Sequence, residues 1–179
     1  LHPDRSEVYV ARAKLNRDLG QFRDALRDFQ RASQRGPGGA WARSEAITMR
    51  LALGNTDEAR EELRQALELY PDAPEILLLR ARVAALVGNA ERAARFYPDY
   101  LATEWADQRV LLEAAYAAAA IGRERAAVEA IEGYAEAKDD EYQLILARAG
   151  TLLLSGAEVR GLALLQELVA EAEWFVPAW

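Results

Sequence analysis

Apolar and small residues recur along the chain in register with a series of evenly spaced glycines. Successive members of this series are 34 residues apart, and they are Gly20, Gly54, Gly88, Gly122 and Gly156. The position five residues after each glycine is always small, and it holds Ala25, Ala59, Ala93, Ala127 and Gly161. Four residues further on, the side chain is always large and apolar: Phe29, Leu63, Tyr97, Ile131 and Leu165. A constant period of this length indicates a chain built from structural repeats.

Each repeat is expected to form a helix of about fourteen residues, a turn centred on its glycine, and a second helix of about thirteen residues. Two short helices cannot bury their own apolar faces, so neighbouring pairs must stack and share a core. The predicted fold is therefore all-α, a right-handed superhelical solenoid of antiparallel helix pairs with a concave and a convex side. The predicted repeats span residues 6–39, 40–73, 74–107, 108–141 and 142–175, with 1–5 ending an earlier repeat and 176–179 beginning a further repeat or cap.

One stretch departs from this regularity. Pro98 falls inside the second predicted helix of the third repeat, where proline removes a hydrogen bond, so we expect a kink or an interruption there. An aromatic cluster surrounds it, consisting of Phe96, Tyr97, Tyr100 and Trp105. Core packing explains Tyr97 and Tyr100, and an aromatic patch that faces a peptide or a sugar is the alternative.

The composition restricts the possible functions. The 179 residues carry a net charge of −7, which disfavours nucleic-acid partners, and they include no cysteine, which excludes disulfides and Cys-based metal sites. No apolar run is long enough for a membrane span. His2 is the single histidine, and the acidic run Asp139, Asp140, Glu141 is interpreted as the start of a helix rather than a cation site. We therefore expect no catalysis, no cofactor and no metal site in this segment.

Charge is distributed unevenly along the chain. Residues 1–39 hold eight basic and five acidic side chains, whereas residues 108–141 hold four basic and eight acidic ones. Within the first repeat, arginines recur every four residues along one helix, at Arg23, Arg27, Arg31 and Arg35. This stripe is interpreted as a solvated face, with a docking ridge for an acidic partner as the alternative.

The repeat pattern resembles that of the tetratricopeptide repeat family. The turn glycine, the small-x-x-x-aromatic or apolar pair and the closing proline are present in "LGQFRDALRDFQRASQRGP" and "LGNTDEAREELRQALELYP". Arg12 and Asn16 depart from the family pattern, which usually has Leu and Tyr at these positions, and the closing prolines stop after the second repeat. Pro3 falls on the closing-proline position of an earlier repeat, so we expect a segment of a longer array. Twenty arginines against two lysines, with many alanines, indicate a GC-rich and bacterial source.

The resemblance implies that the first helix of each pair lines a concave groove that binds an extended or helical peptide. The implied groove residues are apolar with a few cations: Lys14, Arg17, Trp41, Ser44, Thr48, Leu78, Arg82, Arg109, Leu112, Tyr116 and Leu146. Such a groove suits an apolar partner segment bearing acidic residues, and packing between neighbouring pairs is the alternative role for its leucines. The Lys-x-x-x-Asn signature of members that clamp chaperone carboxylates is absent, since Val10 and Lys14 occupy those positions.

The sequence thus predicts a non-enzymatic protein–protein interaction scaffold. By analogy, it is similar to the periplasmic repeat regions of bacterial exopolysaccharide export proteins, which slightly favours the periplasm. Two other functions stay open: a substrate-recruiting arm of a larger enzyme or regulator, and direct carbohydrate binding by the aromatic cluster.

Overall fold

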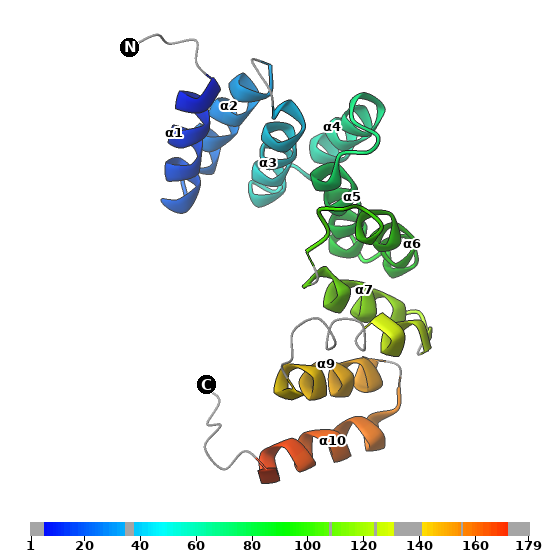
Figure 1. Ribbon diagram of the computed structural model, residues 1–179. Helices are drawn as coiled ribbons and strands as arrows, with labels where there is room; N and C mark the ends of the chain where they lie inside the picture. Colours follow the sequence, from blue (N-terminus) through cyan, green and yellow to red (C-terminus); the bar gives the residue numbers. More distant parts are fainter. Residues whose placement is uncertain are drawn as a thin grey trace. The chain divides into compact units, whose positions relative to one another are not determined.

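The computed structural model describes residues 6–34, 38–107, 109–123, 125–130, 141–154 and 156–171 (Figure 1). These residues form helices and turns, without a strand among them. His2, Asp139, Asp140 and the partial repeats expected at 1–5 and 176–179 lie outside this described part. The fold divides into two compact units, Leu1–Val83 and Ala84–Trp179, which we describe separately.

The first unit contains two antiparallel helix pairs and most of a fifth helix. Its helices are α1 (Ser6–Asp18), α2 (Phe22–Ser33), α3 (Gly39–Ala52), α4 (Thr56–Leu69) and α5 (Pro74–Leu86), of which the last three residues belong to the second unit. The second unit contains α6 (Ala90–Leu101), α7 (Val110–Ala119), α9 (Glu141–Leu154) and α10 (Glu158–Glu171), and residues 125–130 are also helical. Three-residue turns separate α1 from α2, α3 from α4 and α5 from α6, in keeping with the constant sequence period.

The periodic glycines end the first helix of every pair in the same way. Each has a left-handed backbone, with φ values of 73°, 79°, 76°, 73° and 84° at Gly20, Gly54, Gly88, Gly122 and Gly156. The N–H after each glycine donates to the carbonyl five residues earlier, for example from Gln21 to Asn16 at 2.7 Å and from Asn55 to Arg50 at 2.9 Å. This is a Schellman cap, and it favours glycine because other residues are strained in the left-handed region. One turn geometry therefore sets the angle at which every second helix begins.

The small positions of the sequence lie where the two helices of a pair cross. Ala25, Ala59, Ala93 and Ala127 each have 0% exposure. Gly161 is buried at the same position, and a Cβ there would lie 3.0 Å from the carbonyl oxygen of Ala149. Since interiors are packed without free space, a larger side chain in this column would separate the paired helices.

The cores of the first unit show why the pairs must stack. One buried cluster combines Ala13, Ala25 and Phe29 of the first pair with Ala46 and Met49 of α3. A second cluster joins the α3 and α4 pair to α5 through the following residues: Ile47, Ala59, Leu63, Ala66, Ile76, Leu79 and Val83. Each pair thus completes its core with the first helix of the next pair, as expected for a repeat array.

The interruption expected at Pro98 is not found. α6 continues through Pro98 to Leu101, and the N–H of Ala102 donates to the Pro98 carbonyl at 3.0 Å. Pro98 is exposed and lies only three residues before the end of the helix, so it removes one hydrogen bond while the last turn still closes.

Gly54 provides a test of the turn geometry. No atom lies within 4 Å of a Cβ built at Gly54, so a substitution there affects only the backbone conformation. We predict that Gly54→Ala lowers the free energy of unfolding by about 1–2 kcal/mol, and that Gly54→Asn lowers it by less, because Asn tolerates the left-handed region better. Urea denaturation followed by circular dichroism measures both values, and an Ala variant as stable as the parent chain would contradict the prediction.

Candidate partner-binding site

In the first unit, two predicted groove residues, Lys14 of α1 and Trp41 of α3, contact each other. The Trp41 ring makes an edge-to-face contact with Phe29, with centroids 5.7 Å apart. The Nζ atom of Lys14 lies 5.0 Å from the Trp41 ring centroid, within the range of a cation–π interaction. Trp41 is only half-buried, so a core contact holds a partly accessible aromatic ring in place.

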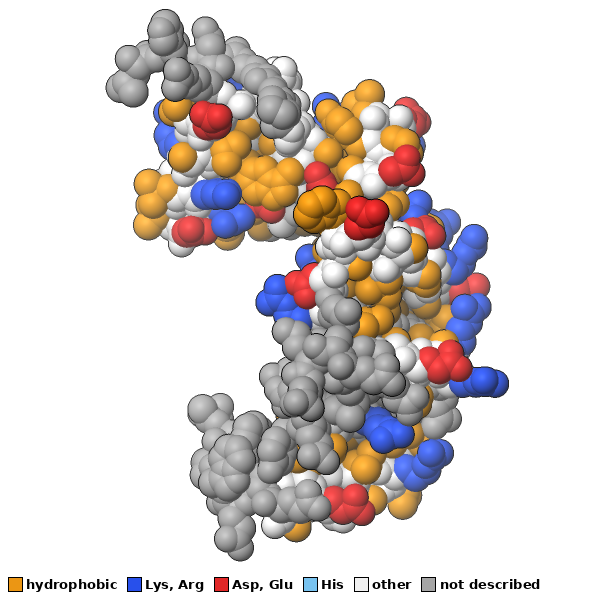
Figure 2. Space-filling view, in the orientation of Figure 1, with side chains coloured by type: hydrophobic (Ala, Val, Ile, Leu, Met, Phe, Trp, Pro, Cys, Tyr) orange, Lys and Arg blue, Asp and Glu red, His pale blue; other side chains and the backbone are white. Residues whose placement is uncertain are grey.

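An ion pair links α1 to α3 through another predicted groove residue. The Nη1 of Arg17 lies 2.7 Å from a carboxylate oxygen of Glu45, and its Nε donates to Asp18 at 3.2 Å. The hydrogen bond with Glu45 raises the pKa of Arg17, with smaller contributions from the hydrogen bond with Asp18 and from the charges of both carboxylates. Arg17 is therefore held in place, with much of its charge compensated. On the face of the molecule drawn in Figure 2, hydrophobic side chains lie next to basic and acidic ones.

The prediction for Ser44 was wrong. Ser44 is buried, with 7% exposure, and its hydroxyl donates to the Trp41 carbonyl at 2.9 Å. Thr48, one turn further along α3, is exposed, and its hydroxyl donates to the Ser44 carbonyl at 2.9 Å. The side chains of α1 and α3 that stay exposed or half-buried here are Lys14, Arg17, Trp41, Glu45 and Thr48, and we call this set the α1–α3 face. On α5, Leu78 is half-buried and Arg82 is exposed.

In the second unit, the predicted groove residues do not all face solvent. Leu112 packs against a buried alanine cluster on α7 and residues 125–130, so its side chain is partly buried in the core. Tyr116 is 41% exposed, and a Cβ built at Gly150 would lie 3.1 Å from its ring, so the ring lies against α9. Leu146, also on α9, is 39% exposed.

Arg109 is part of a local ion pair. Its Nη2 and Nε lie 2.5 Å and 2.9 Å from Asp107 Oδ2, and its backbone N–H donates to Asp107 Oδ1 at 2.9 Å. This ion pair between Asp107 and Arg109 lies in the turn that precedes α7. Arg109 consequently carries a charge that is already compensated, which weakens the expectation that it attracts acidic residues of a partner.

The aromatic cluster around Pro98 is largely structural. Tyr97 and Tyr100 are buried, with 2% and 5% exposure, and Phe96 is half-buried. The Tyr97 hydroxyl donates to Glu113 at 3.1 Å, and the Tyr100 hydroxyl accepts from the N–H of Asp107 at 2.7 Å. Trp105 is 78% exposed. Because two of the four rings cannot reach a ligand, the aromatic patch considered for a peptide or a sugar is not formed as such.

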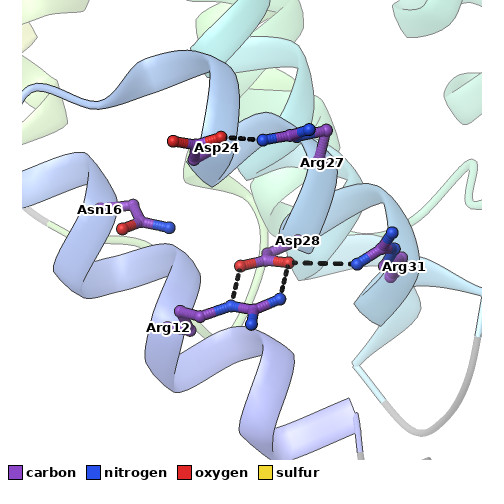
Figure 3. A pocket seen from close by; sticks show the side chains of 6 residues that line it. All are labelled: Arg12, Asn16, Asp24, Arg27, Asp28 and Arg31. Atoms are coloured by element: carbon purple, nitrogen blue, oxygen red, sulfur yellow. Dashed lines mark hydrogen bonds and ion pairs between the residues drawn. The ribbon is translucent and has the colours of Figure 1, made fainter.

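A polar pocket lies between α1 and α2, and its volume is about 360 Å³. Figure 3 shows its lining, in which side chains from α1 face those from α2: Arg12, Asn16, Asp24, Arg27, Asp28 and Arg31. Arg12 donates two hydrogen bonds to the buried carboxylate of Asp28, from Nε at 2.6 Å and from Nη2 at 2.7 Å. These hydrogen bonds, together with the charge of Asp28, raise the pKa of Arg12. We call this feature the α1–α2 pocket.

Sequence reasoning did not identify the α1–α2 pocket, although a signal was present. Arg12 and Asn16 are the two positions where the first repeat has polar residues in place of the large apolar residues of the family pattern. The arginine stripe contributes as well: Arg23, Arg27 and Arg31 are exposed, and Arg35 lies outside the described residues. Only the folded helix pair shows that both features border one cavity.

A corresponding pocket between α3 and α4 has the opposite charge. It is about 650 Å³ and is lined by two arginines, four acidic residues and a glutamine: Arg43, Arg50, Asp57, Glu58, Glu61, Glu62 and Gln65. Glu61 and Gln65 lie 34 residues after Arg27 and Arg31. Two helix pairs with one backbone geometry therefore present different charges at the same place in the repeat.

Neither metal binding nor a membrane span is apparent in the described part of the chain. No group of three or more His, Cys, Asp or Glu side chains there is placed to hold a metal ion. None of its helices combines the length and the apolar character that crossing a bilayer requires.

Comparison with known proteins shows what the chain is similar to. The family model described as tetratricopeptide repeat matches residues 17–83, and no curated protein sequence matches the chain. Among similar solved structures, MamA from Desulfovibrio magneticus RS-1 has a TM-score of 0.75 at 13% identity, over 98% of this chain and 100% of that chain. A putative kinesin light chain from Podospora anserina, with nearly identical TPR-like repeats, has a TM-score of 0.75 at 19% identity, over 97% of each chain. YrrB, a TPR protein with an unusual peptide-binding site, has a TM-score of 0.70 at 13% identity, over 97% of this chain and 90% of that chain.

Residues 17–83 thus match the tetratricopeptide repeat family model, and nearly the whole chain has the fold of solved tetratricopeptide repeat structures. Its all-α solenoid fold confirms the prediction from the glycine period. Proteins with this fold generally mediate protein–protein interactions.

The structural role of Tyr100 can be tested by removing its hydroxyl. We predict that Tyr100→Phe lowers the free energy of unfolding by about 1–2 kcal/mol, because the Asp107 N–H loses its acceptor. Tyr116→Phe is the matched control, since this ring is partly exposed, and its effect should stay within about 0.5 kcal/mol. Chemical denaturation measures both, and a Tyr100 variant as stable as the control would show that the hydroxyl does not hold the turn.

Glu61 gives a pH-dependent prediction. Hydrogen bonds from Arg64 and, to a smaller extent, from Gln65 lower the pKa of Glu61 to about 2. Because the folded-state pKa is lowered, the contribution of these bonds is present above the ordinary value of 4.5 and is lost as the pH falls toward 2. NMR titration of the Glu61 side-chain carboxyl should give this low midpoint, and Arg64→Gln should move it upward. A midpoint near 4.5 in the parent chain would contradict the pairing.

Proposed function

We propose that the chain is a non-enzymatic scaffold that binds a segment of a partner protein on the first helices of its repeats. The observation that carries this proposal is the α1–α3 face. There, Phe29 holds Trp41 from the core side while Lys14 lies over its ring. Aromatic side chains that are fixed before binding are effective anchors, because little conformational freedom is lost when a partner covers them.

The charges on this face indicate how it would select a partner. Arg17 pairs with Glu45, which lies one turn along α3 from Trp41, and Lys14 lies over the Trp41 ring, so the face has both signs of charge and an aromatic ring. An apolar side chain of the partner would contact Trp41, and polar groups of either sign could pair at the rim. We therefore propose a partner segment that is apolar at its centre, and we place less weight on the acidic residues predicted from the sequence.

The other functions considered from the sequence receive less support. Carbohydrate binding by the aromatic cluster is disfavoured, because Tyr97 and Tyr100 are buried. A recruiting arm of a larger enzyme would use the same α1–α3 face, so it is a special case of the proposal. The role in exopolysaccharide export and the periplasmic location stay hypotheses from the sequence, because the similar structures share only the fold with this chain.

The proposal is tested with peptides selected from a random library against the whole immobilised chain. We predict that Thr48→Arg weakens the binding of such a peptide at least about tenfold, since it places a long charged side chain on the α1–α3 face. Gln166→Arg is the matched control, because Gln166 is exposed on α10 and the change in charge is the same. Isothermal titration calorimetry measures both dissociation constants.

A second pair of variants tests the aromatic anchor in the same assay. Trp41→Ala should abolish peptide binding, while Trp105→Ala, at an exposed tryptophan outside the face, should change it by less than about twofold. Circular dichroism checks that the Trp41 variant keeps its helices. Peptides that bind all of these variants equally would place the binding site elsewhere.

A further inference from the structure

The α1–α2 pocket carries a surplus of positive charge. Three arginines and two aspartates line it, which leaves a net charge of +1. Arg12 compensates the buried Asp28, and Arg27 pairs with Asp24 (Figure 3). Arg31 lies 3.9 Å from Asp28, which is the limit of an ion pair and leaves its donors loosely engaged. The corresponding pocket between α3 and α4 has two arginines against four acidic residues, so the second repeat does not share this surplus.

The guanidinium groups of the pocket are accessible and held in place. The side chains of Arg12, Arg27 and Arg31 are 56%, 70% and 54% exposed. Tyr9 lies under two of them, with its ring centroid 5.9 Å from the Arg12 guanidinium carbon and 5.7 Å from that of Arg31. Each guanidinium has five N–H donors, and Arg12 uses two of them on Asp28. The pocket therefore presents spare N–H donors on arginines whose positions are fixed by Asp28 and Tyr9.

Asn16 adds a neutral group to the same wall. Its amide can donate as well as accept a hydrogen bond, so it can face an anion without a charge penalty. The family pattern has a large aromatic residue at this position and a leucine at the position of Arg12, and both would fill the space that the pocket occupies. The two departures from the pattern thus act together, because one opens the cavity and the other gives it charge.

We propose that the α1–α2 pocket binds a single carboxylate from an acidic segment of a partner protein. A carboxylate carries one negative charge, which matches the surplus of +1, and its two oxygens fit the paired donors of a guanidinium. A phosphate dianion would bring a second negative charge close to Asp24 and Asp28, so it fits less well. The pocket lies between the first and second helices of a repeat, so this contact is additional to the α1–α3 face.

The test uses NMR of the whole chain, observing the arginine side-chain Nε–H signals. The probe is a tri-glutamate peptide blocked at both ends, and the blocked tri-glutamine peptide is the neutral control. We expect the signals of Arg12 and Arg31 to shift with the glutamate peptide at millimolar concentrations and to stay unchanged with the glutamine peptide. Inorganic phosphate at the same concentrations and ionic strength should cause smaller shifts of these signals.

Variants establish which arginines hold the carboxylate. The double variant Arg27→Gln, Arg31→Gln should weaken binding of the glutamate peptide about five- to tenfold, the loss expected for two partly exposed charge-assisted contacts. The double variant Arg60→Gln, Arg64→Gln is the matched control, since both residues are exposed on α4, and it should bind the peptide as the parent chain does. Because Arg12 supports the buried Asp28, it is left unchanged, and circular dichroism confirms that the variants keep their helices.

The possible outcomes separate this proposal from the function proposed above. Absent shifts at Arg12 and Arg31, tighter binding of phosphate than of the peptide, or equal losses in both double variants would each overturn the carboxylate site. None of these results affects the α1–α3 face, whose test uses other peptides and other variants. A selective loss in the Arg27, Arg31 variant together with weak phosphate binding would support the proposal.

Discussion

The close crossing of two helices at a small residue is the contact on which the structure depends. In each pair that residue lies five positions after a left-handed glycine, as with Ala25 after Gly20, and a side chain larger than alanine would not fit there without moving a helix. The glycine sets the direction of the second helix, and the small residue sets its distance from the first. Because both recur every 34 residues, the surface positions of one pair recur in the next.

Most of the charged and aromatic groups that suggest a ligand in the sequence are engaged within the chain. Arg109 closes a turn with Asp107, and the Tyr100 hydroxyl accepts from the backbone of that same aspartate. Arg17 joins α1 to α3 through Glu45. Such contacts stabilise the positions of helices and turns, and they reduce the number of groups that can act on a partner. Trp41 is different, since its contacts fix the ring while part of it stays accessible.

The two polar pockets show how a repeat array can diversify without changing its fold. Residues 34 positions apart occupy corresponding places, yet Arg27 and Arg31 of the first repeat correspond to Glu61 and Gln65 of the second. The helix pairs keep the same caps and the same small crossing residues, so these substitutions alter the surface charge and leave the backbone unchanged. Each pair can thus present a different surface charge on the same backbone.

The sequence by itself determined the repeat, the helix pairs and the turns, because the glycines and small residues act through local geometry that recurs at a fixed spacing. Of the groove residues that it predicted on α1 and α3, Ser44 is buried and its hydroxyl bonds to its own helix. The tertiary structure decided which charged side chains are engaged within the chain. Ion pairs such as Arg17 with Glu45 join residues 28 positions apart, and no periodic pattern relates them. It also decided that Arg12 and Asn16 border one cavity, because a departure from a pattern becomes a site only when two helices bring its residues together.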